Sequence, residues 1–211
     1  LRPQFTQNLE LAHKLLWESG SFYTSLYHKI IDDFYTRIYI QDPIHSEIMI
    51  KAYDNLGRAT NSGIEITLDQ KITKVWKISA SANAYFNTIF PKSGTIDFPQ
   101  PQAYSIPKRT DTPVFAKLTS QVSLPGEMIL EMTGQFFSRK NIGQGRELAR
   151  GGIDLGVKKS MAGSKLEFNL SATDIFNTMG IRQEIDGHGF YTEYQNFYET
   201  QVFTISARYK F

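Results

Sequence analysis

Residues 196–211 read N-F-Y-E-T-Q-V-F-T-I-S-A-R-Y-K-F, and from Phe203 onward apolar and polar side chains alternate strictly. One face carries Phe203, Ile205, Ala207, Tyr209 and Phe211, and the other carries Thr204, Ser206, Arg208 and Lys210. A period of two predicts a β-strand. An apolar face that ends in aromatic residues is typical of a strand that faces lipid and ends in an interfacial aromatic girdle. This stretch alone leaves an amphipathic strand of a soluble β-sandwich open as the alternative.

The composition excludes several classes of protein. Hydrophobic residues make up 41% of the 211 residues, and no apolar run is long enough for a membrane-spanning helix. A spanning β-barrel stays possible because half of each strand faces water. Cysteine is absent, which excludes a disulfide framework and a thiolate metal site. The 23 basic and 21 acidic residues nearly cancel and form no basic block, so nucleic acid is a poor candidate partner.

Further alternating segments precede the terminal one. The clearest lie at 64–69, 76–86, 114–124, 128–135, 153–158 and 165–172. Residues 3–17 alternate less perfectly, and Trp17 closes their apolar face. The segment that begins at Phe22 is predicted to run on through Asp32 and Asp33 as far as Ile40. Adjacent strand residues face opposite ways, so these two carboxylates cannot share a catalytic site. The pair is interpreted as a bend near the membrane rim.

The connections between these segments alternate in length. Pro125-Gly126 and Ala162-Gly163 are tight turns, whereas the long connections cover 90–110, 140–149 and 176–195. Residues 90–110 contain four prolines and no periodicity, which predicts an irregular loop. Short turns on one side and long loops on the other are the pattern of outer-membrane barrels, with the long loops outside the cell.

The strand count favours an incomplete barrel. About nine strands are predicted, the first beginning on the long-loop side and the last ending on the short-turn side. An inserted hairpin within 21–70 would add two and leave the number odd. Bacterial single-chain barrels have an even number of strands, and lipid does not tolerate an unpaired sheet edge. We therefore expect residues 1–211 to be one antiparallel transmembrane β-barrel segment that is completed by further strands or by a second chain.

Five short motifs resemble a known family. In chain order they are L-R-P-Q-F-T (1–6), N-L-G-R-A-T-N-S-G-I-E-I (55–66), D-L-G-V-K-K-S (154–160), A-T-D-I-F-N-T (172–178) and I-S-A-R-Y-K-F (205–211). Together they resemble the C-terminal barrel half of TonB-dependent outer-membrane receptors, most closely the Bacteroidetes outer-membrane β-barrel branch. The resemblance extends over nearly the whole chain.

The resemblance implies a fold and a set of partners. Members of that family have a barrel of about 22 strands, a plug domain inside it and a segment that contacts TonB. This chain would then be the C-terminal portion of such a barrel in the outer membrane of a Gram-negative bacterium, and it contains no plug and no TonB-contacting motif. Phe211, with Tyr209, would form the end signal that the barrel-assembly machinery reads. The implied function is uptake of a bulky nutrient such as a siderophore, glycan or peptide.

Candidate sites are few. The four histidines are far apart and lack the spacing of metal ligands. No nucleophile-and-base arrangement appears, so neither an enzyme nor a cofactor or metal site is predicted. The richest aromatic stretch, 181–198, contains the predicted outer-loop contacts His188, Tyr191 and Tyr194. Its last two aromatics, Phe197 and Tyr198, are interpreted as members of the interfacial girdle.

Two other functions remain open at this stage. One is a structural or interaction barrel, an outer-membrane part of a surface complex without transport of its own. The other is a soluble β-sandwich binding module. An encoded plug separates a receptor from a structural barrel, and solubility without detergent indicates the sandwich.

Overall fold

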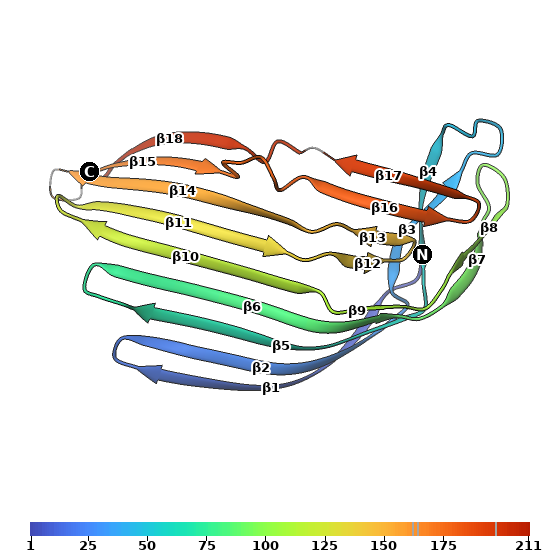
Figure 1. The fold of residues 1–211 in the computed structure, drawn as a ribbon, viewed down its shortest axis with the longest axis horizontal. Helices are drawn as coiled ribbons and strands as arrows, with labels where there is room; N and C mark the ends of the chain where they lie inside the picture. The colour runs from blue at the N-terminus through green and yellow to red at the C-terminus, as the bar shows by residue number, and fades with distance from the viewer. Residues whose placement is uncertain (162, 164, 197) are drawn as a thin grey trace.

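A computed structural model describes residues 1–161, 163, 165–196 and 198–211, and their regular structure is entirely antiparallel β-strand. Nine long strands form one open sheet in the order β1-β2-β5-β6-β10-β11-β14-β15-β18 (Figure 1). Their bounds are β1 Phe5–Trp17, β2 Gly20–Asp32, β5 Arg58–Lys71, β6 Trp76–Ile89, β10 Val114–Leu124, β11 Met128–Phe137, β14 Arg150–Met161, β15 Leu166–Thr173 and β18 Val202–Tyr209. Among the described residues no helix could span a membrane.

The remaining strands are short and lie at the long-loop end of the sheet (Figure 1). The strand β9 (Arg109–Asp111) pairs with the end of β6. The other strands form hairpins: β3 (Tyr35–Gln41) with β4 (Met49–Asn55), β7 (Lys92–Ile96) with β8 (Gln102–Ile106), β12 (Lys140–Ile142) with β13 (Gly145–Glu147), and β16 (Ile181–Gly187) with β17 (Phe190–Asn196). We call these four hairpins the crown.

The structure confirms the predicted all-β, antiparallel character and corrects three details. The described residues form eighteen strands rather than about nine, because the long connections fold into hairpins. The predicted irregular loop at 90–110 contains β7 and β8. The predicted continuous strand from Phe22 to Ile40 is also wrong. It breaks at Asp33, which has a φ of 51°, a left-handed conformation that a strand does not accommodate.

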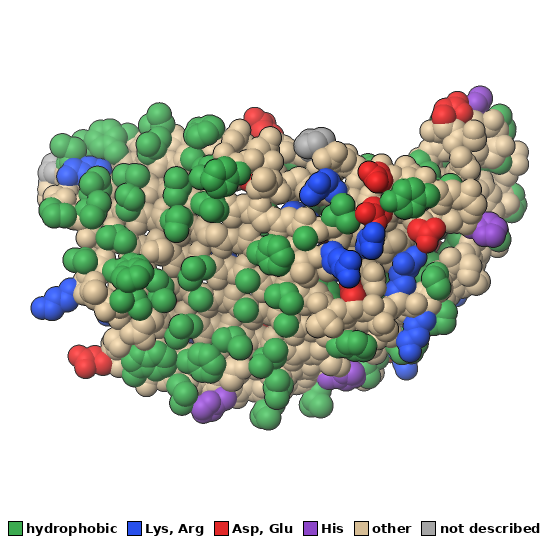
Figure 2. All heavy atoms as spheres, in the orientation of Figure 1, with side chains coloured by type: hydrophobic (Ala, Val, Ile, Leu, Met, Phe, Trp, Pro, Cys, Tyr) green, Lys and Arg blue, Asp and Glu red, His purple; other side chains and the backbone are tan. Residues whose placement is uncertain are grey.

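The register places apolar side chains on one face of the long strands. Ala80 lies opposite Leu68 on one side and Leu118 on the other. The same parity carries across to β18, where Ile205 lies opposite Leu170. Figure 2 views this outer face, with apolar side chains spread over the long strands and charged side chains gathered towards the crown. The alternation predicted from the sequence therefore yields one continuous apolar surface.

The opposite face of the sheet is polar and internally hydrogen-bonded. Tyr27 donates to Asn83 at 2.9 Å, and the Ser79 hydroxyl donates to Asp69 at 2.5 Å. Farther along the sheet, Glu167 lies between Lys158 at 3.4 Å and Lys210 at 2.9 Å. A polar face opposite a lipid-facing one is the arrangement of a barrel lumen.

Aromatic residues border the apolar face at both ends. Trp17 and Trp76 lie at the short-turn end, and their indole nitrogens donate to Gln70 and Ser120, each at 2.9 Å. Phe86 lies ten residues beyond Trp76 on the same strand and face. Ten residues span about 33 Å along a strand. A tilt of about 40° reduces this to about 25 Å, the height of the apolar band of an outer-membrane barrel.

Both edges of the sheet are open. Strands β1 and β18 end the pairing path and do not pair with each other. Every residue of both strands is exposed, on the polar face as well as the apolar face. The chain therefore forms a curved wall (Figure 1), and its two outermost strands present unpaired backbone groups along their length.

Candidate functional site at the crown

The crown has its own hydrophobic core. Buried side chains from three separate parts of the chain meet there, namely Ile38, Ile40, Leu56, Ile89, Tyr104 and Ile106, and Phe34, Ile50 and Ile96 pack against them. The long strands below lack such a core, because one of their faces is apolar surface and the other is polar. The β3–β4 and β7–β8 hairpins are thus packed together on one core.

A buried amide joins two hairpins of this crown. The Gln144 side chain accepts a hydrogen bond from the Tyr39 amide at 2.6 Å and donates to the Tyr39 carbonyl at 3.1 Å. Gln144 itself is only 2% exposed. The Tyr39 hydroxyl donates to Gln183 at 3.3 Å, which extends the connection to β16. Strands β3 and β16 and the β12–β13 turn are therefore linked by polar contacts as well as by packing.

Tyr104 connects the β7–β8 hairpin to the core of the crown and to β4. Its ring lies in the core of the crown, and its hydroxyl donates to the carboxylate of Asp54 on β4. Burial raises the pKa of Tyr104, and its hydrogen bond to the Asp54 carboxylate raises it further. The phenol therefore stays protonated at physiological pH and acts as a hydrogen-bond donor.

A cavity of about 430 Å³ opens between these hairpins. Its walls combine aromatic rings, amides and a carboxylate, contributed mainly by Tyr39, Asp42, Gln102, Tyr104, His188 and Phe190. The Gln102 side-chain nitrogen is buried and, among the described residues, has no hydrogen-bond partner. Small-molecule sites are concave and combine aromatic side chains with a few convergent polar groups. This one could hold a ligand that carries both a flat apolar surface and hydrogen-bonding groups.

The predicted contact residues occupy different places around this cavity. His188 lines it, in the turn between β16 and β17. Tyr194 lies outside it, with its ring under the Lys51 ammonium at 3.7 Å from nitrogen to ring centroid. Tyr191 is three residues before Tyr194 on β17, so its side chain lies on the opposite face of the strand, and it is 62% exposed. The structure brings His188 to the cavity and leaves the two tyrosines outside it, and the contact role of all three stays a prediction.

The other predicted residues lie at the far end of the sheet or at its rim. Tyr209 is on the apolar face of β18, opposite Leu166, and its ring meets that of Phe211 edge-on at 5.3 Å. Their role as an assembly signal stays a prediction. At the rim, Tyr198 is 59% exposed, and Phe197 lies outside the described residues.

The A-T-D-I-F-N-T motif forms a tight turn after β15. The Asp174 carboxylate accepts hydrogen bonds from the Thr178 and Met179 amides, both at 2.9 Å, and from the Thr200 hydroxyl at 2.6 Å. Burial would raise the pKa of Asp174, but these hydrogen bonds outweigh it and lower the pKa. The turn directs Phe176, which is 64% exposed, onto the apolar face. The motif by itself did not indicate this structural role of the carboxylate.

The crown cavity holds the features that sequence analysis missed. Gln144 and Tyr39 are 105 positions apart, and neither belongs to a recognisable motif. Across the described residues, no group of three or more histidine, aspartate or glutamate side chains could hold a metal ion. The walls of the crown cavity offer aromatic faces and hydrogen-bonding groups to a ligand.

Comparison with known proteins assigns the family. A family model described as the outer membrane protein beta-barrel family matches residues 1–209. The chain belongs to this family. Membership in the outer membrane protein beta-barrel family identifies the apolar face as the lipid-facing surface and the polar face as the lumen side. It also puts the crown outside the cell and the short turns on the periplasmic side. Searches of curated proteins and of solved structures gave no match.

Proposed function

We propose that this chain is the C-terminal barrel portion of a TonB-dependent outer-membrane receptor that takes up a bulky nutrient. The observation that carries this proposal is the pair of open edges on β1 and β18. In a bilayer every backbone polar group needs a partner, because no water is present to bind it. Further strands must therefore pair with both edges, either from the same polypeptide or from another chain.

The width of the wall supports a large barrel. A barrel of about eight strands fills its interior with its own side chains, whereas barrels of about 22 strands enclose a plugged lumen. The nine long strands here do not curve far enough to meet. Their lumen side carries charged and amide groups such as Glu65, Lys117 and Gln121. A wide polar lumen fits the passage of a bulky, hydrogen-bonding nutrient, with the crown cavity at its entrance.

A structural barrel within a surface complex is the second candidate. The observation in its favour is the packed core of the crown, which gives the outer surface a fixed shape. Preformed surfaces of this kind bind a stable protein partner without ordering cost. In this function the barrel needs neither a plug nor energy from the inner membrane.

One preparation distinguishes these functions. The native protein is extracted from outer membranes, its intact mass and N-terminal sequence are determined, and its binding to the isolated periplasmic domain of TonB is measured. A receptor is expected to be several times heavier than 24.1 kDa and to bind that domain. A heavier protein without such binding would favour the structural barrel. A mass equal to that of the present chain would mean that a partner chain closes the barrel.

A further inference from the structure

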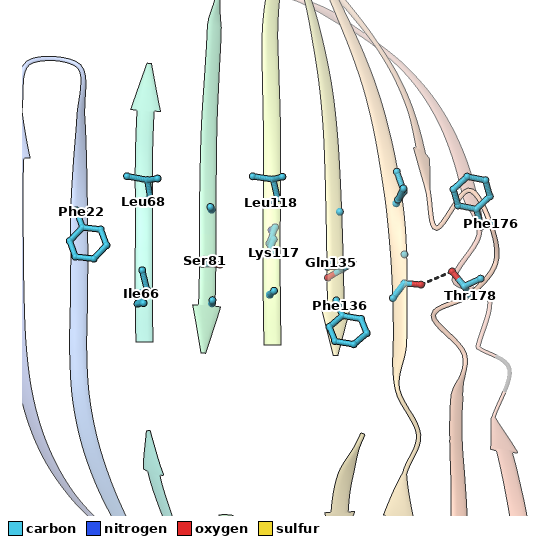
Figure 3. Close-up of a pocket in the computed structure, with 17 residues that line it drawn as sticks. Phe22, Ile66, Leu68, Ser81, Lys117, Leu118, Gln135, Phe136, Phe176 and Thr178 are labelled. Atoms are coloured by element: carbon cyan, nitrogen blue, oxygen red, sulfur yellow. Dashed lines mark hydrogen bonds between the residues drawn. The ribbon is translucent and has the colours of Figure 1, made fainter. Parts of the chain in front are cut away.

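The lipid-facing surface contains an apolar hollow. It has a volume of about 820 Å³ and crosses the middle strands of the sheet. Figure 3 shows Phe22 and Phe176 at its two sides, with Leu68 and Leu118 between them and Phe136 at its lower end. The floor is low because small side chains meet across the strand pairs, with Ala82 opposite Ala116.

The hollow differs from the neighbouring lipid-facing surface in the small side chains at its floor. Bulky side chains elsewhere fill the space between strands, for example where Leu170 lies opposite Ile205. A hollow that stays empty in the bilayer loses the dispersion contacts of its lining atoms. A flexible methylene chain restores those contacts, and acyl chains are the groups that surround this face of an outer-membrane barrel.

A polar pocket lies beyond the crown-side end of the hollow. Phe136 lines the hollow near the end of β11 at Phe137, and Ser138 follows directly after that strand. Ser138 lines a second pocket of about 390 Å³ together with Thr110, Thr112, Arg139, Asn141 and Arg146. Thr110 of this pocket lies opposite Thr88, which is two residues beyond Phe86 on the same face of β6, and this corresponds to the depth of lipid headgroups.

Arg139 carries the available positive charge in this pocket. It is exposed, and within the described part of the chain it forms no ion pair. Arg146 is paired with Glu184, and the carboxylate of Asp111, which also lines the pocket, accepts hydrogen bonds from Asn87 and Asn141. A guanidinium beside several hydroxyl groups is a good match for a phosphate, which takes both charge and hydrogen bonds.

We propose that these two features form one binding site for a lipid of the outer leaflet. An acyl chain occupies the hollow between Phe22 and Phe176, and the phosphate of the headgroup contacts Arg139. This proposal depends only on the outer-membrane location of the family. It is therefore independent of whether the barrel transports a nutrient. A bound lipid would fill the hollow between the two aromatic borders.

The test is lipid retention by the whole native protein. Wild-type protein is purified from outer membranes in a mild detergent and washed with a large excess of that detergent. Bound lipid is then counted by native mass spectrometry and by phosphorus assay. We expect at least one phosphorus-containing lipid per protein. Ala82→Phe with Ala116→Phe fills the hollow and is expected to reduce retention at least tenfold.

Two further variants make the result specific. Arg139→Gln removes one exposed charge without touching the hollow, and we expect it to reduce retention several-fold. Ala207→Phe adds the same bulk to the apolar face of β18, away from the hollow, and is expected to retain lipid like the wild type. The proposal is overturned if the wild type retains no lipid, if the filled hollow retains as much as the wild type, or if Ala207→Phe loses it equally. Unchanged retention by Arg139→Gln would overturn the headgroup assignment.

Discussion

Gln144 forms both of its side-chain hydrogen bonds with the backbone of a single residue, Tyr39. The side-chain amide of Gln144 thus makes the two hydrogen bonds that a neighbouring strand would otherwise make. Tyr39, within β3, would otherwise have a backbone donor and acceptor without partners inside the crown. This contact links the β12–β13 turn to a hairpin 105 positions earlier in the chain. The outer hairpins consequently behave as one packed unit.

Replacement of Gln144 by leucine should loosen the crown and leave the sheet intact. The change leaves the Tyr39 amide and carbonyl buried without partners, at a cost of about 1–3 kcal/mol for each group. Hydrogen exchange followed by mass spectrometry should show faster exchange in β3 and the β12–β13 turn. Gln195→Leu, on the exposed side of β17, is the matched control. If this control variant also showed faster exchange in β3 and the β12–β13 turn, a specific role of the Gln144–Tyr39 contact would be contradicted.

Asp174→Asn should destabilise the turn after β15 in a pH-dependent way. The pKa of Asp174 is below its ordinary value of 3.8, so its stabilising contribution is fully present above pH 3.8. The contribution is lost as the pH falls through the lowered pKa. Thermal unfolding of wild type and variant should therefore differ most near pH 7, by about 2–3 kcal/mol, and converge in strong acid. A constant difference down to pH 2 would contradict this role.

Leu118→Arg should strongly destabilise the protein in a bilayer. Leu118 lies on the lipid-facing side near mid-height, between the two aromatic borders. An arginine at this depth costs about 2–4 kcal/mol. Gln121→Arg, on the lumen side of the same strand, is the control and should cost little. Equal urea-unfolding midpoints for the two variants would mean that the faces are wrongly assigned.

The two tryptophans should report the periplasmic interface. Trp17 and Trp76 are the only tryptophans in the sequence, and both border the apolar face at its short-turn end. In vesicles, lipids brominated close to the headgroup should quench their fluorescence more than lipids brominated near the chain ends. Stronger quenching from the chain ends would place both residues at the bilayer centre and contradict the proposed height of the band.

The long strands could be predicted from the sequence because their two faces meet different solvents. Alternation in segments such as 114–124 reports directly which side faces lipid, without knowledge of any neighbour. The crown gave no such signal. Its strands are short, its core uses side chains as distant as Ile38, Leu56 and Ile106, and 90–110 is interrupted by prolines. The crown forms through contacts between distant segments, which a local pattern cannot show.

The candidate site was predictable only in part for the same reason. His188 stands out in an aromatic stretch, but only the fold brings it near Tyr104 and Gln102. The sequence did not indicate that Arg139 and Phe136 belong to one site. A positive charge beside an apolar hollow becomes visible only on the folded surface. The open edges, in contrast, follow from strand parity, which the order of short and long connections already indicated.

The shared core of the crown restricts how its surface can diversify. Hairpins that stand alone can be lengthened, exchanged or lost one at a time, since each costs only its own folding energy. Here Ile38, Tyr104 and Ile106 belong to one core, and Gln144 joins a further hairpin to it. We therefore expect insertions to be tolerated at the hairpin tips, such as 42–48 and 97–101, whereas the residues that share the core must change together. New binding specificities of the outer surface would thus arise by changes in the hairpin tips, while the residues of the shared core stay the same.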